Sequence, residues 1–180
     1  MKRKAIFLDR DGTINPDPGY ISNSDDFNLF DGVAESLAAI KKAGYLLILI
    51  SNQSGIARKL ITPEALDKIH EKLQKLLKPY DAEFDAIYFC PHHPDFPYEG
   101  ITDCNCRKPK PGMILQAIKD WGIDPSLSYM AGDRDSDIKA GIKSSVEPVL
   151  ISKSPSEKYP ETRHFQNMQD FVKWLLSGTL

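Results

Sequence analysis

The sequence predicts an α/β fold in which helices flank a mostly parallel β-sheet, and two observations support this prediction. Short apolar runs alternate with longer amphipathic stretches along the chain, which is typical of buried strands joined by crossover helices. Three of the apolar runs are followed by turns rich in Asp, Asn, Ser and Gly. A chain of 180 residues suffices for one core, so we expect a single domain over residues 1–180.

Five apolar segments are predicted to form the strands of this sheet. Each is short and bounded by polar residues or turns, as expected of a strand that is buried on both faces. The segments are Ala5–Leu8, Tyr45–Ile50, Ala86–Phe89, Tyr129–Ala131 and Val149–Ile151.

Four helices are predicted from apolar residues that recur at helical spacing. Gly44 and Gly122 end two of these patterns and suit the residue that follows a helix. Thr62 and Pro63 offer the second helix an N-cap and a first-turn proline, and Pro111 opens the third. We expect all the apolar positions in the core: Val33, Leu37 and Ile40; Leu66, Ile69, Leu73, Leu76 and Leu77; Ile114, Leu115, Ile118 and Trp121; and Met168, Phe171, Val172, Leu175 and Leu176.

Composition limits the classes of partner. The net charge of −2 argues against binding to nucleic acid or to an anionic membrane. The apolar run near the N-terminus is cut off at Asp9, and no other run approaches the ~20 residues of a membrane-spanning helix. Three cysteines without an export signal indicate a reducing cytoplasm, where we expect a monomer. His70 and His164 are expected at the surface.

Four candidate metal ligands lie in one stretch, as Cys90-Pro-His92 and Cys104-Asn-Cys106, which holds all three cysteines of the chain. Three thiols cannot pair completely as disulfides, whereas three thiolates and an imidazole suit a closed, structural Zn²⁺ site. The alternative is three free thiols that lie together by chance. His93 is a competing nitrogen ligand, but the matching spacing of the two pairs favours His92. We call residues 90–108 the cysteine loop and expect zinc to stabilise it.

Polar residues follow three of the predicted strands. Asp9 and Asp11 come after the first strand and, two residues apart in an extended chain, can face one pocket. Ser51–Gly55 follows the second strand, and Gly132–Asp137 follows the fourth. Each turn alone is weak support, because these residue types are common in turns. Together they predict a site outside the carboxyl ends of the strands, where open α/β sheets bind ligands.

These turns resemble the motifs of the haloacid dehalogenase superfamily of phosphotransferases. The resemblance implies a haloacid dehalogenase-like Rossmannoid fold. It also implies a capless enzyme, because the segments on either side of Ser51 are too short to hold a cap domain. The matching residues are Asp9 to Thr13 for Asp-x-Asp-Gly-Thr, Ser51 for the second motif, Lys108 for the third, and Gly132-Asp133 with Asp137 for the fourth.

The resemblance also implies roles for these residues. Asp9 is the nucleophile that forms an aspartyl-phosphate, and Asp11 is the general acid and base. Lys108 and Ser51 bind phosphoryl oxygens. Mg²⁺ is expected between nucleophile and phosphate, held by Asp9, Asp133 and an oxygen of Asp11, its backbone carbonyl in the resemblance. Two roles stay open for Asp137: support of the metal site, or the cap of the next helix.

The cysteine loop and the residues after it, Cys-Pro-His-His-Pro and Cys-x-Cys-Arg-Lys-Pro-x-Pro-Gly-Met, are similar to one branch of the superfamily. That branch contains the D-glycero-D-manno-heptose 1,7-bisphosphate 7-phosphatases and the histidinol-phosphate phosphatases. A sugar-contacting Asp-x-Gly-Tyr loop and the second-motif loop favour the heptose enzymes, which remove the 7-phosphate in making activated heptose for lipopolysaccharide core or related glycans. The expected substrate-binding residues are Asp17, Gly19, Tyr20, Asn52, Gln53, Ser54, Arg107 and Arg134.

Four other functions remain as alternatives. A histidinol-phosphate phosphatase acts on a cationic substrate with one phosphate, for which Arg107 is an awkward neighbour; Arg107 suits a second phosphate, or is simply solvated. A nucleic-acid 3′-phosphatase lacks support from the net charge. A phosphorylatable receiver domain carries its phosphorylated Asp after the third strand, where this chain has Cys90. An inactive zinc-binding module is disfavoured because every catalytic position is filled.

Overall fold

A computed structural model describes residues 2–178 and contains a six-stranded parallel sheet with helices on both faces. The strand order is β3-β2-β1-β4-β5-β6, with every neighbouring pair parallel. The strands are β1 (Lys4–Leu8), β2 (Tyr45–Asn52), β3 (Ala86–Cys90), β4 (Tyr129–Gly132), β5 (Glu147–Ile151) and β6 (Arg163–Phe165). The helices are α1 (Val33–Lys42), α2 (Pro63–Leu77), α3 (Gly112–Trp121), α4 (Asp135–Lys143) and α5 (Met168–Ser177), with 3₁₀ turns at 24–26, 78–80 and 125–127.

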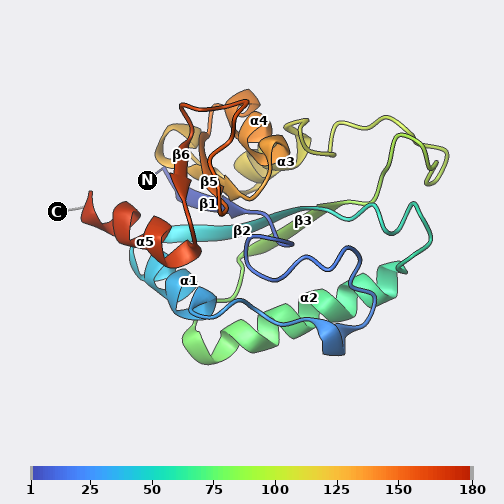
Figure 1. Ribbon diagram of the computed structural model, residues 1–180, viewed down its shortest axis with the longest axis horizontal. Coiled ribbons are helices and arrows are strands. Elements are labelled where there is room, and N and C mark those ends of the chain that lie inside the picture. The colour runs from blue at the N-terminus through green and yellow to red at the C-terminus, as the bar shows by residue number, and fades with distance from the viewer. Residues whose placement is uncertain (1, 179–180) are drawn as a thin grey trace.

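Two hydrophobic cores lie on the two faces of the sheet. Alternate residues of β1 point to opposite faces: Ile6 and Leu8 join the core beneath α1, α2 and α5, whereas Ala5 and Phe7 join the core beneath α3 and α4. Figure 1 shows these two helix layers on either side of the strands. Because both faces are covered, the central strands read as continuous apolar runs and not as an alternating pattern. The predicted α/β fold is confirmed.

The helix boundaries follow the predicted signals at most ends. The Thr62 hydroxyl accepts a hydrogen bond from the Ala65 amide at 3.2 Å and caps α2. Gly44 and Gly122 have φ angles of +83° and +62°, which suit the residue after a helix. Pro111 is the N-cap of α3 and not a residue inside it. The strand β6 was not predicted, because three residues of mixed polarity give no periodic signal.

Two expectations about burial were wrong. Leu115 is 46% exposed, because it lies on the outer side of α3 while Met113, Ile114 and Ala117 fill the core. His70 is buried at 8% exposure, and its ring centroid lies 5.8 Å from that of Phe89. His70 follows Ile69 on the buried face of α2, which is wider than the predicted apolar stripe. His164 on β6 is half-buried, and its Nε2 lies 2.7 Å from the Ser152 carbonyl.

The topology determines where a site can form. The chain runs from β1 outward to β3 on one side, then crosses to β4 on the other side of β1. The carboxyl end of β1 is therefore the switch point at which open α/β sheets bind ligands. The connections after β1 and β2 hold one long helix and one 3₁₀ turn each, so no cap domain is present there. In residues 2–178 no helix is long and apolar enough to cross a membrane.

Candidate active site

A cavity of about 250 Å³ opens at the carboxyl ends of β1 and β2. The four residues predicted to be catalytic and seven of the eight predicted to bind substrate line it. The wall consists of Asp9, Asp11, Asp17, Gly19, Tyr20, Ser51, Asn52, Ser54, Arg107, Lys108, Arg134 and Ser136. The structure therefore brings together residues from the Asp9–Tyr20 segment, the turn after β2, the end of the cysteine loop and the start of α4.

Asp9 and Lys108 form the buried centre of this cavity. The Lys108 ammonium lies 2.8 Å from Asp9 Oδ1 and 2.6 Å from Asp137 Oδ1, and it donates to the Ile50 carbonyl at 2.7 Å. Burial lowers the pKa of Lys108, but Asp137 and Asp9 outweigh this effect and raise it above its ordinary value. Burial raises the pKa of Asp9 to about 7, against the attraction of Lys108 and with the repulsion of Asp137. Lys108 is thus held charged beside Asp9 at the centre of the cavity.

Asp9, Asp133 and Asp137 offer carboxylate oxygens that all lie within 4.8 Å of one another. Burial and the charge of Asp137 raise the pKa of Asp133, so the group is short of positive charge. Three hard oxygen donors with unbalanced negative charge fit a divalent cation such as Mg²⁺. Gly12, with φ +87°, lies so close that a Cβ would stand 2.3 Å from an Asp133 oxygen. Glycine is therefore required at this position.

Asp133 does not line the 250 Å³ cavity but lines a second cavity of about 560 Å³ together with Gly12 and Thr13. The Thr13 hydroxyl donates to Asp133 Oδ1 at 3.4 Å. The side chain of Asp11 is not part of the carboxylate group. The expected role of the Asp11 backbone carbonyl as a metal ligand stays a prediction.

The carboxylate of Asp11 is held by three neighbours. Arg10 donates from Nε to Oδ1 at 3.0 Å and from Nη2 to Oδ2 at 2.8 Å, while Asn15 and Gln53 donate to Asp11 at 2.9 Å each. Burial raises the pKa of Asp11, but the Arg10 guanidinium and these hydrogen bonds outweigh it and hold the pKa below its usual value. Asp11 is therefore ionised and fixed in orientation in the free protein.

Arg10 and Gln53 are buried next to the cavity, do not line it, and contact residues that do. Arg10 is 1% exposed and donates to the Gln53 side-chain oxygen at 3.1 Å. The Gln53 amide also donates to the Ser51 hydroxyl at 2.7 Å. Gln53, which was expected to bind substrate, is buried and absent from the cavity lining. It instead joins Asp11 to Ser51.

Asn52 attaches the end of the cysteine loop to β2. Its side-chain oxygen accepts from the Lys108 amide, and its side-chain nitrogen donates to the Lys108 carbonyl, both at 3.0 Å. This reciprocal pair sets the backbone of Lys108, and the carbonyl of Ile50 holds its side chain. The backbone and the side chain of Lys108 are therefore both held in place beside Asp9.

Asp137 caps the next helix, which is one of the two roles left open by the sequence, and it also forms an ion pair; its support of a metal site stays a prediction. Its Oδ2 accepts from the Arg134 amide at 3.0 Å at the start of α4, and its Oδ1 pairs with Lys108. Across the cavity mouth, the Arg134 guanidinium pairs with Asp17. Asp17 also accepts from the Gly19 amide at 2.9 Å, which shapes the turn before Tyr20.

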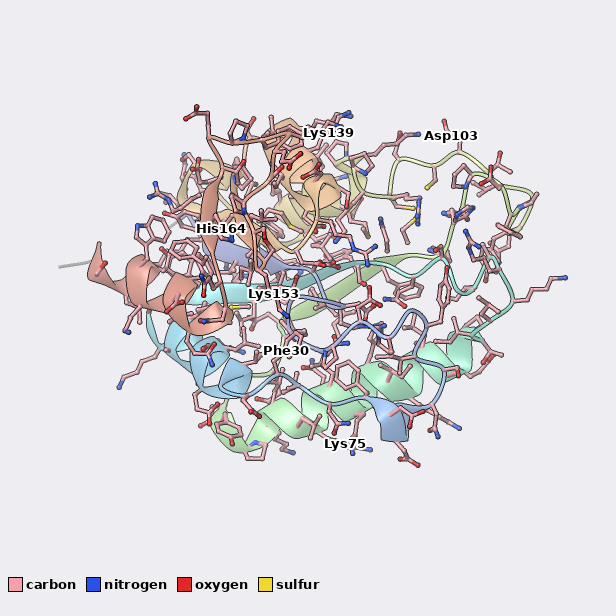
Figure 2. All side chains as sticks on the ribbon, in the orientation of Figure 1. Phe30, Lys75, Asp103, Lys139, Lys153 and His164 are labelled. Carbon is pink, nitrogen blue, oxygen red and sulfur yellow. The ribbon has the colours of Figure 1, made fainter. Side chains whose placement is uncertain are left out.

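The three thiols and His92 of the cysteine loop come together, with their ligand atoms within 4.8 Å of one another. Cys106 Sγ lies 2.9 Å from Cys90 Sγ and 3.2 Å from Cys104 Sγ, too far for a disulfide, and His92 Nδ1 lies 3.3 Å from Cys106 Sγ. This Cys₃His cluster is compatible with zinc. His93 lies outside it, since its Nε2 faces Arg58 at 2.8 Å. Figure 2 shows the loop near the labelled Asp103.

Comparison with known proteins gives the family. A family model described as polynucleotide kinase 3 phosphatase matches residues 4–145. The D-glycero-beta-D-manno-heptose-1,7-bisphosphate 7-phosphatase of Haemophilus influenzae is 44% identical over 169 residues, which cover 94% of this chain and 90% of that protein. The chain belongs to this heptose bisphosphate phosphatase family. The enzyme of the same name from Escherichia coli K12 is 40% identical over 169 residues, 93% of this chain and 87% of that protein.

Solved structures of the family share the fold. The D,D-heptose 1,7-bisphosphate phosphatase of B. bronchiseptica, complexed with magnesium and phosphate, is 28% identical and superposes with a TM-score of 0.85, covering 98% of this chain and 99% of that one. A putative haloacid dehalogenase-like phosphatase from Mesorhizobium loti, also 28% identical, has a TM-score of 0.86 and covers 96% of this chain and 85% of that one. The haloacid dehalogenase-like fold is confirmed.

Two residues near the cavity make contacts that were not predicted from the sequence. No role was predicted for Arg10, although it is the positively charged residue between the two motif aspartates Asp9 and Asp11. Arg58 carried no motif at all. Its contact with His93 joins the turn after β2 to the cysteine loop, and sequence spacing does not predict contacts of this kind.

Proposed function

We propose that the chain is a Mg²⁺-dependent phosphomonoesterase that removes the 7-phosphate of D-glycero-beta-D-manno-heptose 1,7-bisphosphate. The observation that carries the proposal is the 44% identity, over 94% of the chain, to an enzyme of that name. The cavity supports it, because its wall joins three carboxylates with Lys108 and two arginines. We further propose that residues 1–180 act as one phosphatase domain with the cysteine loop inserted.

In the first step, an oxygen of Asp9 attacks the phosphorus atom of the 7-phosphate. The bond from phosphorus to the C7 oxygen breaks, and Asp11 gives that oxygen a proton, so that heptose 1-phosphate leaves. Lys108 and Ser51 hold the phosphoryl oxygens. In the free protein Asp11 is kept ionised by Arg10, and an arriving phosphate would raise its pKa, which favours the protonated form that this step uses.

In the second step, Asp11 takes a proton from water, and the resulting hydroxide attacks the aspartyl-phosphate. The bond between phosphorus and the Asp9 oxygen breaks, which restores the Asp9 carboxylate and releases inorganic phosphate. Asp11 is then protonated for the next turnover. Mg²⁺ bound by Asp9, Asp133 and the Asp11 carbonyl would offset the repulsion between carboxylate and phosphate.

The second phosphate of the substrate suggests a use for the two arginines at the cavity mouth. Arg107 is anchored to the cysteine loop by donating to the His92 carbonyl at 3.2 Å. Its planar guanidinium is suited to bidentate phosphate binding. Tyr20, 46% exposed, and the Asp17–Gly19 turn are the proposed sugar contacts. Zn²⁺ in the Cys₃His cluster would fix the loop that carries Arg107 and Lys108.

Phosphate release by the purified protein with Mg²⁺ tests the proposal. The substrates are both anomers of the heptose bisphosphate, histidinol phosphate and an oligonucleotide with a 3′-phosphate; the last corresponds to the description of the matching family model. We expect the β-bisphosphate to give the highest kcat/KM. Asp9→Asn should lower kcat on the order of 10⁴-fold or more with every substrate, because the amide is not a nucleophile. A preference for histidinol phosphate or the oligonucleotide would overturn the substrate and leave the mechanism standing.

A further inference from the structure

Arg58 occupies a turn that is tied to the wall of the active-site cavity. Its amide donates to the Ser54 carbonyl at 3.1 Å, and Ser54 lines the cavity. The next turn of chain is closed by Leu60, whose amide donates to the Gly55 carbonyl at 2.8 Å. Gly55 leaves no room for a side chain, since a Cβ would stand 2.9 Å from the Tyr20 ring. A shift of Arg58 would therefore move Ser54 and the residues packed on Gly55.

The side chain of Arg58 ends in the cysteine loop. Its Nη2 donates to His93 Nε2 at 2.8 Å, and its guanidinium carbon lies 4.6 Å from the centre of the Phe96 ring. The rings of His93 and Phe96 meet edge to face with centroids 5.1 Å apart. His93 is 9% exposed. The imidazole and the phenyl ring thus form two sides of a socket for the guanidinium.

This socket is not a strong source of stability. Within residues 2–178 no carboxylate lies within 4.0 Å of an Arg58 nitrogen, and the buried Arg58 Nε has no hydrogen-bond partner there. A guanidinium has no acceptor, so His93 Nε2 has to be the acceptor in its contact with Arg58, while the other ring nitrogen, Nδ1, faces the Asp95 amide at 3.1 Å. A charged group with one neutral acceptor and an unpaired donor adds little to the free energy of unfolding. The contact is better explained by the two segments that it connects, the turn after β2 and the cysteine loop.

Arg107, which lines the opposite wall of the cavity, contacts the same part of the cysteine loop. Arg107 donates to the carbonyl of His92, the residue next to His93. His92 belongs to the Cys₃His cluster, in which a bound zinc would fix its position. Two consecutive histidines therefore contact residues of two different walls. His92 accepts from Arg107, whereas His93 contacts Arg58, whose amide is bonded to Ser54.

We propose that His93 and Phe96 are positioning residues that, through Arg58, set the distance between the Ser51–Ser54 turn and Arg107. The inference rests on the proposed phosphatase function, because the two walls matter only if one substrate bridges them. It assigns to His93 a role in substrate binding that is separate from metal binding. Loss of the socket weakens binding of a substrate that contacts both walls and leaves the reaction at Asp9 unaffected.

The test compares His93→Ala, His93→Gln, Arg58→Met and the Arg58→Met/His93→Ala double variant. We expect KM for the bisphosphate to rise on the order of 10-fold in His93→Ala and Arg58→Met, with kcat within about twofold of wild type. The double variant should be no worse than either single one. His93→Gln should recover part of the loss, since its side-chain oxygen can accept from Arg58. Zinc content should remain that of the wild type.

Arg163→Met and His164→Ala are the matched controls. These neighbours lie on β6, at the opposite edge of the sheet from β3, where Arg163 covers the Trp174 ring at 4.2 Å; Figure 2 labels His164. Neither change should alter KM. Unchanged KM in His93→Ala, additive losses in the double variant, or loss of zinc in His93→Ala would each overturn the proposal.

Hydrogen exchange separates this proposal from the function on which it rests. In His93→Ala the amides of residues 54–61 should exchange faster, because the socket no longer holds Arg58. Faster exchange in a wild-type-like fold that hydrolyses no sugar bisphosphate would support the socket and overturn the proposed function. Exchange confined to the cysteine loop would show that the contact does not reach Ser54, whatever the substrate.

Discussion

Lys108 Nζ lies 2.8 Å from Oδ1 of Asp9, so the lysine and the proposed nucleophile are paired in the free protein. Both groups are almost fully buried, with 2% and 10% of their side chains exposed. Asp137, on the other side of the lysine, completes a buried triad of one cation and two carboxylates. The arrangement keeps Lys108 charged and pre-positioned, which is the form in which it can stabilise a transferred phosphoryl group.

Lys108→Met should lower kcat by about 10²- to 10³-fold, because a cation is removed from the phosphoryl oxygens. It should also destabilise the metal-free protein by about 3 kcal/mol, since two buried carboxylates lose their partner. Steady-state kinetics and urea unfolding measure the two effects. Lys110→Met is the matched control, because Lys110 pairs with the exposed Asp103 and should change neither quantity appreciably. Equal effects of the two substitutions would contradict this role for Lys108.

Arg10→Met should weaken both the fold and catalysis. The methionine fits the space of a side chain that is 1% exposed, but Asp11 loses two hydrogen bonds and its opposite charge. We expect a loss of about 3 kcal/mol in the free energy of unfolding, together with a lower kcat. Arg3→Met, which removes a cation 6.0 Å from the Trp121 ring centroid, is the control and should have little effect. A variant as stable and active as the wild type would show that Arg10 does not position Asp11.

His70 makes stability depend on pH. Burial, with a further contribution from Arg10 and against that of Asp11, lowers the pKa of His70 from 6.5 to about 4. The unfolded chain therefore binds a proton near pH 6.5, while the folded chain does so only near pH 4. Burying the neutral imidazole therefore costs no free energy of unfolding above pH 6.5. As the pH falls from 6.5 to 4, the free energy of unfolding decreases by about 3 kcal/mol, because the unfolded chain binds the proton first. Unfolding in urea at pH 7.5 and pH 5 should show a smaller loss for His70→Gln than for the wild type. An identical loss in both proteins would contradict the buried, neutral state.

Cys104→Ser tests whether a metal holds the cysteine loop. A structural zinc site contributes free energy to folding, so the variant should lose zinc and melt at a lower temperature. Activity should fall as well, because the loop leads directly to Arg107 and Lys108. Asp103→Asn, in the same loop but exposed, should retain the metal and the melting temperature. A Cys104→Ser protein that lost zinc and kept its melting temperature would show that the cluster is not structural.

The sequence determined the features that depend on neighbouring residues. Continuous apolar runs predicted the buried strands, and the Thr62-Pro63 pair marked the start of α2. The carboxylates and hydroxyls after β1, β2 and β4 predicted a site at one edge of the sheet, because parallel strands end on the same side. These predictions succeed because the side-chain periods of helices and strands are local properties of the chain.

Tertiary structure alone decided which distant groups meet. It placed His93 against Arg58, a contact that the ligand spacing favouring His92 for the thiol cluster did not predict. It gave Asp137 both a helix cap and an ion pair, and it buried His70 on a helix face wider than the apolar stripe. Such contacts depend on how segments far apart in the chain pack together. An interior at close packing selects one arrangement that no local pattern specifies.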